Sequence, residues 1–336
     1  MKKKLLIMHH NTIEENTGGI TSVMRNMHPY FAKEFDVTYM TLPKSWQHGS
    51  TRANYFIYCW LHKNEFKKYD FVISHIPESS YFMVKSGVPC IHICHSAANP
   101  MRSGSWIKRP FIWFFDYLQN TIVAKCPLIY YVGKKLRAND KKLYNPLRQN
   151  VTPLPLEQRK GFVFPGRLIS LKRVNRLIDI YSKLPENIRE SNPFYIIGDG
   201  DCRESLENQV KSLGLEKQVI FKGSMPNDKI MEEVSSKKMV LMASTTEGFP
   251  TSIAEGFSVG LPAISTNVGS IPDVVKNDVN GFYLPKDFDD REYVKLIEKV
   301  FNDYPRFSEA ALENSKVFNA ERVTQGIIDD IHRMID

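Results

Sequence analysis

The sequence lacks the patterns of a disulfide-stabilised or zinc-binding protein. Its 336 residues include only five cysteines, an odd number, and no two of them form a Cys-x-x-Cys pair. Scattered cysteines of this kind favour neither a disulfide framework nor a zinc site. We therefore expect a reducing cytoplasmic location and no bound metal. The cysteines are Cys59, Cys90, Cys94, Cys126 and Cys202.

Long apolar runs are absent as well. No stretch approaches the ~20 residues needed to span a bilayer, and the most apolar one, 111–115, ends at Asp116. The N-terminus starts with lysines, but only four apolar residues precede His9 and His10. This pattern predicts a first strand, with two histidines at its end that could line a site, and not a signal peptide.

Acidic residues are scarce in the first half of the chain. Residues 1–152 contain 21 Lys and Arg against 9 Asp and Glu (net +12), whereas the remaining residues contain 24 against 28 (net −4). A basic domain is attracted to an anionic membrane, a nucleic acid or a polyanionic acceptor. General solubility is an equally simple explanation and stays open. The aromatic residues of this half follow no nucleic-acid-binding motif, so we expect no nucleic-acid partner.

Strand-like and helix-like segments alternate in both halves, which predicts an α/β fold with two doubly wound domains. The length also suits two domains of roughly 150 residues. A turn-rich segment between residues 144 and 155 is the expected linker. The expected strands are 4–9, 37–41, 71–75, 90–94 and 128–132, then 161–165, 194–198, 219–222, 239–243 and 262–265; helices are expected at 19–31, 106–124 and, without a following strand, 305–336.

The most informative segment runs from Glu247 to Glu255. A buried strand precedes it, residues 244–250 form a Gly- and Pro-containing loop, and residues 251–259 have helical spacing. The start of a helix at the carboxyl end of such a strand suits a diphosphate. Glu247 could accept hydrogen bonds from sugar hydroxyls, and Glu255 could hold a ribose diol. Alternatively, Glu255 is a surface residue and Glu247 only favours the helix N-terminus.

Two further loops of the second half carry candidate binding residues. Arg167 and Lys172 follow the first expected strand of this half, where two cations can neutralise a phosphate or remain solvated. Gly198 and Gly200 end the next strand and let the backbone approach a ligand closely. Asp199-Gly-Asp201 matches the Asp-x-Asp pattern that binds a metal in a different sugar-transferase architecture. We discount it, because two acidic residues beside a glycine are common by chance.

These motifs resemble a known family. The segments are Gly166-Arg167, Lys172, Gly198-Asp-Gly200, Phe221-Lys-Gly223, Glu247-Gly-Phe-Pro, Glu255 and Asn280-Gly-Phe282. In order and spacing they resemble the retaining GT-B glycosyltransferases of family 4, the glycosyl transferases group 1. The resemblance covers nearly the whole second half. In the first half it rests on Gly18-Gly19 after the first strand and on His95 after the fourth.

The resemblance implies two Rossmann-like domains facing a central cleft. Residues 1–152 would bind the acceptor, residues 153–313 the nucleotide sugar, and a helix over 314–336 would cross back to the first domain. Arg167 and Lys172 would contact the diphosphate, Glu255 the ribose and Glu247 the donor sugar. Further expected contacts are Phe249, Pro250, Thr251 and Ser252 with sugar and phosphate, Gly18 and Gly19 with the phosphates, and His95 with the reacting sugar.

The implied reaction keeps the anomeric configuration without a carboxylate nucleophile or a metal. The acceptor hydroxyl attacks the front face and loses its proton to the departing phosphate. No cofactor is expected, since the donor itself is a nucleoside diphosphate sugar. His92 competes with His95 for the cleft, because alternation along a strand puts the two on opposite faces.

The implied function is transfer of a hexose or N-acetylhexosamine, most frequently from UDP, to a glycan or polyprenyl-linked acceptor of a cell-surface polysaccharide. Residues 102–115 combine cations with aromatic side chains and are either a contact with the inner face of the plasma membrane or a buried helix. A non-catalytic sugar-nucleotide or glycan-binding partner of another transferase is the alternative. An NAD enzyme is disfavoured because Gly18-Gly19 is not part of a Gly-x-Gly-x-x-Gly motif.

Overall fold

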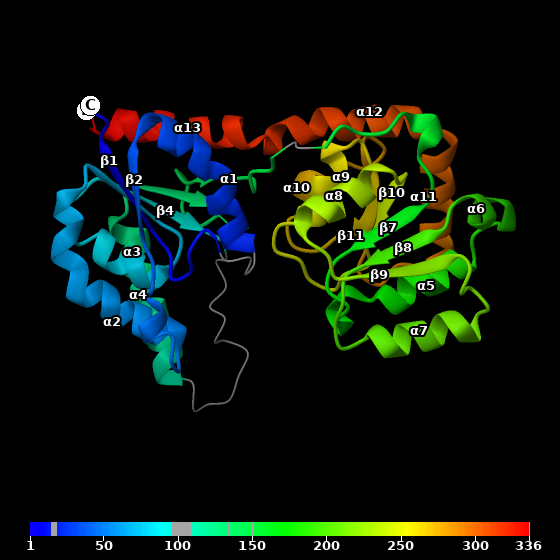
Figure 1. The fold of residues 1–336 in the computed structure, drawn as a ribbon, viewed down its shortest axis with the longest axis horizontal. Coiled ribbons are helices and arrows are strands. Elements are labelled where there is room, and N and C mark those ends of the chain that lie inside the picture. Colours follow the sequence, from blue (N-terminus) through cyan, green and yellow to red (C-terminus); the bar gives the residue numbers. More distant parts are fainter. Residues whose placement is uncertain (15–18, 96–108, 134, 149–150, 336) are drawn as a thin grey trace. The chain divides into compact units, whose positions relative to one another are not determined.

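The computed structural model describes residues 1–14, 19–95, 109–133, 135–148 and 151–335, without the side chains of 109–111 and 227. The chain forms two compact units (Figure 1). The N-terminal unit comprises Met1–Arg148 and Phe318–Asp336, and the C-terminal unit comprises Gln149–Val317. The expected boundaries at 152 and 313 each lie about four residues from these divisions.

The N-terminal unit contains a parallel six-stranded sheet in the order β2-β1-β3-β4-β5-β6. Helices α1 and α13 cover one face, and α2, α3 and α4 cover the other (Figure 1). Because helices cover both faces, every residue of the central strands β3 and β4 is buried. The elements are β1 (Lys4–Met8), α1 (Gly19–Glu34), β2 (Asp36–Met40), η1 (Lys44–Trp46), α2 (Thr51–His62), η2 (Lys63–Lys68), β3 (Phe71–Ser74), α3 (Pro77–Met83), β4 (Cys90–Cys94), α4 (Arg109–Lys125), β5 (Leu128–Tyr131), β6 (Lys141–Lys142) and α13 (Ala320–Ile335). The short helix η6 (Lys316–Phe318) lies at the division, with only Phe318 in this unit.

The C-terminal unit contains a second parallel six-stranded sheet, in the order β12-β11-β10-β7-β8-β9. From β7 the chain first builds toward β9 and then returns to add β10, β11 and β12 on the other side of β7. The strand order therefore reverses between β7 and β10, which is where open α/β sheets bind ligands. The elements are η4 (Leu156–Gln158), β7 (Phe162–Pro165), η5 (Ser170–Lys172), α5 (Val174–Ser182), α6 (Glu186–Ser191), β8 (Phe194–Ile197), α7 (Arg203–Ser212), β9 (Val219–Gly223), α8 (Asn227–Ser235), β10 (Met239–Leu241), α9 (Thr251–Ser258), β11 (Ala263–Thr266), α10 (Ile271–Val274), β12 (Gly281–Leu284), α11 (Asp290–Asn302) and α12 (Tyr304–Ser315).

The ten expected strands are present, with ends that differ by one or two residues, and two further strands were not predicted. Strand β6 has only two residues, too few for a periodic signal. Strand β12 begins at Gly281, where a Cβ atom would lie 1.9 Å from the carbonyl oxygen of Ala263. A glycine is thus needed for β12 to pair with β11, and a glycine start gives a poor strand signal.

The expected helical segment 305–336 is two helices. Helix α12 belongs to the C-terminal unit and α13 to the N-terminal unit, with η6 between them. Helix α13 packs against α1, and its buried Asp330 accepts hydrogen bonds from Tyr130 Oη and Lys141 Nζ, both at 2.6 Å. The last helix is therefore fixed to the sheet of the N-terminal unit.

Candidate functional site

Loops after three strands of the C-terminal sheet interlock at its carboxyl edge. The Gly166 amide donates to Ile197 O (2.9 Å), and the Leu168 amide donates to Asp199 O (2.9 Å). A Cβ atom at Gly198 would lie 2.0 Å from Gly166 O, so the loop after β8 touches the loop after β7 only because residue 198 is glycine. The Thr245 amide donates to Leu171 O (2.8 Å) and so connects the loop after β10.

Lys172 and Glu247 meet across the β7–β10 reversal. Lys172 Nζ lies 2.6 Å from Glu247 Oε1, and the two side chains are only 20% and 9% exposed. Ser244 Oγ donates to the same carboxylate oxygen at 2.6 Å. The carbonyl oxygen of Ser244 in turn accepts from Thr266 Oγ1 at 2.6 Å, which ties the loop to β11. Glu247 is thus held in one orientation by a cation and a hydroxyl.

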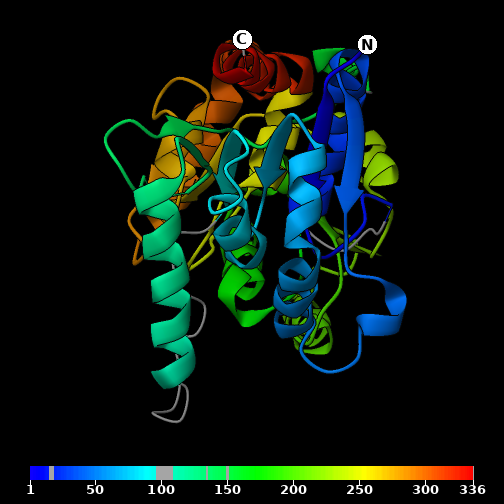
Figure 2. The same cartoon turned by 90° about the vertical axis from the view of Figure 1, so that its left-hand side faces the viewer.

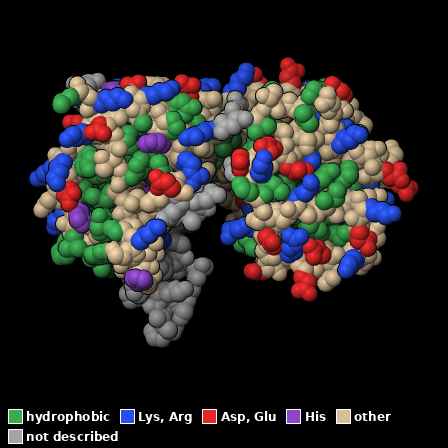
Figure 3. Space-filling view, in the orientation of Figure 1, with side chains coloured by type: hydrophobic (Ala, Val, Ile, Leu, Met, Phe, Trp, Pro, Cys, Tyr) green, Lys and Arg blue, Asp and Glu red, His purple; other side chains and the backbone are tan. Residues whose placement is uncertain are grey.

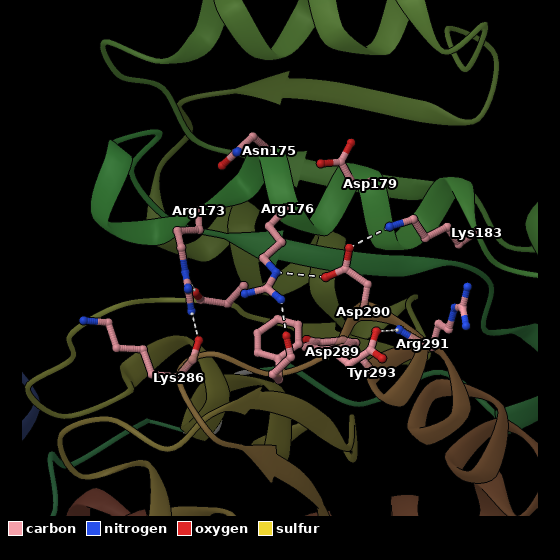
Figure 4. A network of polar contacts seen from close by, with 12 residues as sticks. Arg173, Asn175, Arg176, Asp179, Lys183, Lys286, Asp289, Asp290, Arg291 and Tyr293 are labelled. Carbon is pink, nitrogen blue, oxygen red and sulfur yellow. Dashed lines mark hydrogen bonds and ion pairs between the residues drawn. The ribbon is translucent and has the colours of Figure 1, made fainter.

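Arg173 fixes the loop that carries Lys172. Its backbone is left-handed (φ 48°), an uncommon conformation for a non-glycine residue. Its Nε donates to Ala243 O (2.6 Å). Its Nη2 donates to Lys286 O (3.0 Å), as Figure 4 shows. These bonds hold the turn between η5 and α5 against the ends of β10 and β12.

A second arginine reinforces the same turn from helix α5. The Arg176 guanidinium lies 3.7 Å from the centre of the Phe288 ring, and its Nε donates to Asp290 Oδ1 at 2.9 Å (Figure 4). Lys183 Nζ contacts the other oxygen of Asp290 at 2.7 Å. These contacts fix helix α5 to the start of α11. Together with the bonds of Arg173, they fix the turn that follows Lys172.

Helix α9 starts directly above this edge. Ser252 Oγ donates to Pro165 O at 2.8 Å and anchors the first turn of α9 to the end of β7. The amide of Thr251 is used within the turn, since it donates to Phe249 O at 2.9 Å. Gly256 packs closely on β10, because a Cβ atom there would lie 2.5 Å from Val240 Cγ2. Glu255 lies half-buried on the same helix.

Arg167 differs from Lys172 in its surroundings. Its side chain is exposed, and its guanidinium makes no hydrogen bond or ion pair with the described part of the chain. Asp199 pairs with Arg203 at 3.5 Å. In the described ranges, no group of three or more His, Cys, Asp or Glu side chains is arranged to hold a metal ion. Of the two predicted phosphate-binding cations, Lys172 is therefore paired, whereas Arg167 has no partner among the described residues.

Histidines gather at the corresponding edge of the N-terminal sheet. Its strand order reverses between β1 and β3; His9 and His10 follow β1, and His75 follows β3. His75 Nδ1 lies 3.0 Å from His95 Nε2, and the rings of His9 and His10 stack with centroids 4.2 Å apart. His92 has a different hydrogen-bonding partner, with its Nδ1 2.7 Å from Ser80 Oγ.

The environment keeps these imidazoles neutral. Burial, and to a smaller extent the neighbouring His92 and His9, lowers the pKa of His95 to about 3. Burial also lowers the pKa of His9 and of His92 to about 4. A buried cation without a counter-ion is costly, so the charged form is disfavoured. A neutral ring can donate one hydrogen bond and accept another.

The structure brings together the candidates of the C-terminal unit: Arg167, Lys172, Gly198, Gly200, Glu247, Phe249, Pro250, Thr251, Ser252 and Glu255 lie on its interlocked loops and on α9. Gly19 and His95 lie in the N-terminal unit, and Gly18 lies outside the described residues. An added Cβ at Gly19 would meet nothing within 4 Å, so close packing does not require this glycine.

Three residues of the C-terminal edge escaped the sequence analysis. Ser244 and Arg173 orient Glu247 and the Lys172 loop, and neither belongs to a recognisable motif. Gly269 has φ +56°, and a Cβ atom there would lie 1.8 Å from Glu247 O. The sequence signal for Gly269 is a glycine shortly after an expected strand, which is common in loops.

Two doubly wound parallel six-stranded sheets are the architecture of the GT-B class of fold. Residues 150–317 match the family model described as glycosyl transferases group 1, and the chain belongs to this family. The predicted family is confirmed.

Curated relatives resemble part of this chain in sequence. The chain is 32% identical over 155 residues to lipopolysaccharide 1,6-galactosyltransferase of Salmonella typhimurium, with 44% of this chain and 43% of that protein covered. It is 25% identical over 250 residues to a Campylobacter jejuni N-acetyl-D-galactosaminyltransferase named for an acceptor on diphosphoundecaprenol, with 70% and 67% covered. The match to the Salmonella protein therefore spans less than half of that relative.

A solved structure matches across both units. Anabaena HepE in complex with UDP and glucose gives a TM-score of 0.72 at 16% identity, over 98% of this chain and all of that one. At this identity the likeness shows the fold alone, and the predicted GT-B fold is confirmed. Among the described helices, none combines the length and apolar character needed to cross a membrane.

Proposed function

We propose that this protein is a retaining, metal-independent hexosyltransferase. It moves a hexose or N-acetylhexosamine from a UDP-sugar to a glycan or polyprenyl-linked acceptor during synthesis of a cell-surface polysaccharide. It works in the cytoplasm, at the inner face of the plasma membrane. The observation that carries the proposal is the Lys172–Glu247 pair at the β7–β10 reversal, beside the start of α9 and within the segment that matches the family.

The donor diphosphate would bind between the loop after β7 and the start of α9. A lysine ammonium has three donors, and Glu247 uses one of those of Lys172. The others and the Arg167 guanidinium would contact the phosphates, where they stabilise the charge that grows as the glycosidic bond breaks. Glu247 would face the donor sugar and Glu255 the ribose.

The proposed reaction places no protein base at the anomeric carbon. The acceptor hydroxyl attacks the face from which the diphosphate departs, and the proton passes to a phosphate oxygen of the leaving group. The C–O bond to the diphosphate breaks as the new glycosidic bond forms on the same face. Neutral His95 would contact the reacting sugar by hydrogen bonding.

The names of similar proteins support the donor and the acceptor classes. The HepE structure contains UDP and glucose, and the Campylobacter relative is named for a lipid-linked glycan acceptor. A non-catalytic sugar-nucleotide-binding role is the second candidate. No residue favours this role, because the chain retains all four residues that the proposed transfer reaction uses: Arg167, Lys172, Glu247 and Glu255.

Calorimetric titration of UDP, GDP and ADP in EDTA tests the nucleotide site. We expect UDP to bind, and Arg167→Ala and Glu255→Ala each to weaken binding at least tenfold, as loss of a charged hydrogen bond of about 1.5–3 kcal/mol predicts. Lys211→Ala, an exposed residue of α7, is the matched control. Binding of none of the three nucleotides would contradict the site. Binding without release of UDP from UDP-sugars, with or without acceptor lipid, would favour the non-catalytic role.

A further inference from the structure

Large apolar side chains are exposed on two neighbouring helices of the N-terminal unit. Among the described residues, six of the twelve large exposed apolar side chains lie on α2 and α4. Trp60 is 52% exposed and Trp113 is 80% exposed. The other four are Ile57, Leu61, Phe114 and Tyr117. Scattered single exposed side chains are normal on a protein surface, whereas a cluster marks an interaction site.

Ring contacts join the two helices and α3 into one surface. The Phe56 and Phe114 rings lie 5.3 Å apart, and the Tyr81 and Tyr117 rings 5.9 Å apart. The first turns of α4 extend beyond the other elements of the N-terminal unit (Figure 2). Figure 3 shows hydrophobic and basic side chains side by side over the region of α2. The surface formed by α2, η2, α3 and α4 is called the aromatic–lysine face below.

A lysine-lined pocket lies within this face. Its volume is about 620 Å³, its lining includes Lys63, Lys67 and Lys85, and no carboxylate lines it. Two of the lysines lie against aromatic rings: Lys63 Nζ is 5.6 Å from the Trp60 ring centre, and Lys85 Nζ is 4.0 Å from that of Tyr81. The pocket is therefore cationic, and the exposed Trp60 and the half-buried Tyr81 line it.

We propose that the aromatic–lysine face docks on an anionic phospholipid bilayer. Trp60 and Trp113 enter the interfacial layer, and the lysine pocket holds headgroup phosphates. Tryptophan and tyrosine favour the boundary between headgroups and acyl chains, and lysines on the same surface are attracted by acidic lipids. The pocket and the exposed rings are separate features of one surface, and a bilayer satisfies both.

Charge argues against a second copy of the chain as the occupant. A twofold interface brings the same patch of both copies together. Two lysine-rich patches, each with Lys63, Lys67 and Lys85, would then be brought together, and like charges brought close in an interface are unfavourable. A soluble phosphate compound would fill the pocket but would leave Trp60 and Trp113 in water.

The proposal rests on the proposed function, since it supplies the bilayer that holds a polyprenyl-linked acceptor. It also places the membrane contact on a different set of residues from the expected segment 102–115. The 102–108 part of that prediction lies outside the described residues, whereas the aromatic–lysine face uses α2, η2 and α3 in addition to α4. The buried-helix alternative does not hold for Trp113 and Phe114, which are exposed.

Sedimentation with vesicles tests the docking. Full-length protein is mixed with vesicles of phosphatidylcholine alone or with 30% phosphatidylglycerol. Each basic residue near an acidic leaflet contributes roughly fivefold to binding, so K63E/K67E/K85E should lower the partition coefficient for the anionic vesicles at least about 100-fold. K211E/K217E/K295E, which changes three exposed lysines of the C-terminal unit by the same charge, should stay within about twofold.

A second variant tests the apolar half of the face. Brominated lipids should quench tryptophan fluorescence of the parent protein on binding, and W60A/W113A should lose most of this quenching and bind anionic vesicles at least about tenfold more weakly. Unchanged melting temperature and UDP binding in each variant verify folding, and UDP binding separates failure of docking from failure of the nucleotide site.

Three results would overturn the proposal. The first is binding that does not depend on the lysines, seen either as equal binding to neutral and anionic vesicles or as unchanged vesicle binding of K63E/K67E/K85E. The second is a dimer in light scattering that W60A/W113A abolishes while vesicle binding is unaffected, which would make the face a contact between copies. The third is binding of glycerol phosphate at the lysine pocket, by calorimetry, without any vesicle binding.

Discussion

At the scale of single residues, the C-terminal site depends on how one carboxylate is held. Glu247 accepts hydrogen bonds from Lys172 and Ser244 on the same oxygen. The arrangement restrains the lysine before a ligand arrives, so less conformational freedom is lost on binding. In the proposed mechanism the two residues have separate roles, Lys172 toward the phosphate and Glu247 toward the sugar.

Substitution should separate these roles. Lys172→Met is expected to weaken UDP binding about 10- to 100-fold, because a charged hydrogen bond contributes about 1.5–3 kcal/mol. Glu247→Gln should bind UDP within about threefold of the parent but lose more affinity for UDP-sugars. Calorimetry with UDP and UDP-sugars measures both. Lys211→Met is the control, since Lys211 is an exposed lysine of α7; an equal loss there would contradict the assignment.

Gly269 allows a comparison of two glycines with similar backbones. Gly269 and Gly214 have φ angles of +56° and +66°, but only at Gly269 would a Cβ atom clash, at 1.8 Å from Glu247 O. Gly214→Ala should cost about 1–2 kcal/mol of folding free energy from the left-handed conformation alone. Gly269→Ala should cost more and also weaken UDP-sugar binding. Urea denaturation and calorimetry measure the pair; equal effects would show that the close approach relaxes readily.

At the scale of elements, the connection of α13 to the N-terminal sheet passes through one carboxylate. Asp330 is buried and contacts Tyr130, Lys141 and Arg333. Neighbouring Asp329 is exposed and accepts one hydrogen bond from Gln325. The two residues share a helix and a charge but differ in burial.

Asp330→Ala should therefore destabilise the protein by about 2–3 kcal/mol. Removal of one partner of a fully buried pair costs about 3–5 kcal/mol, and the figure is reduced here because Lys141 and Arg333 are 43% and 68% exposed. Asp329→Ala should change the free energy of unfolding by less than about 0.5 kcal/mol. Urea denaturation tests the difference, and hydrogen exchange should show α13 opening first in Asp330→Ala.

At the scale of the whole molecule, the N-terminal unit should be the acid-sensitive part. His9 and His92 are 3% and 4% exposed, and burial lowers the pKa of each to about 4. The unfolded chain, with a His pKa near 6.5, binds more protons than the folded one between these values, so stability falls as the pH falls from about 6.5 to about 4. At pH 5 each histidine should cost about 2 kcal/mol.

Denaturation at pH 7 and pH 5 checks this dependence. The free energy of unfolding of the N-terminal unit should fall by several kcal/mol, and His92→Gln should remove part of the difference while it weakens the unit at pH 7. The C-terminal unit contains no histidine, so its UDP-detected unfolding provides an internal reference. An equal loss in both units would point to carboxylates instead.

Much of the fold was predictable because strands of a buried parallel sheet are mostly apolar along their length. Residues 71–75, 90–94 and 239–243 stand out for this reason, and each contains a strand of the structure. Helix α3 was not predicted, since it has only seven residues and begins at a proline after a strand. Helix α2 was missed as well, because exposed Trp60 and Leu61 obscure its periodicity.

The sequence by itself determined the two α/β halves, the family and the residue types of the proposed nucleotide site, because these depend on local spacing and on motifs that stay close along the chain. Only the tertiary structure decided that Lys172 meets Glu247 and Ser244, that Arg173 and Gly269 hold the loops around them, and that Trp60 and Trp113 lie on one surface with a lysine pocket. Apart from Ser244, which is three residues from Glu247, the partners are distant in the sequence, and Lys172 lies 75 residues from Glu247. Strand order and helix packing bring them together, and no local pattern encodes either.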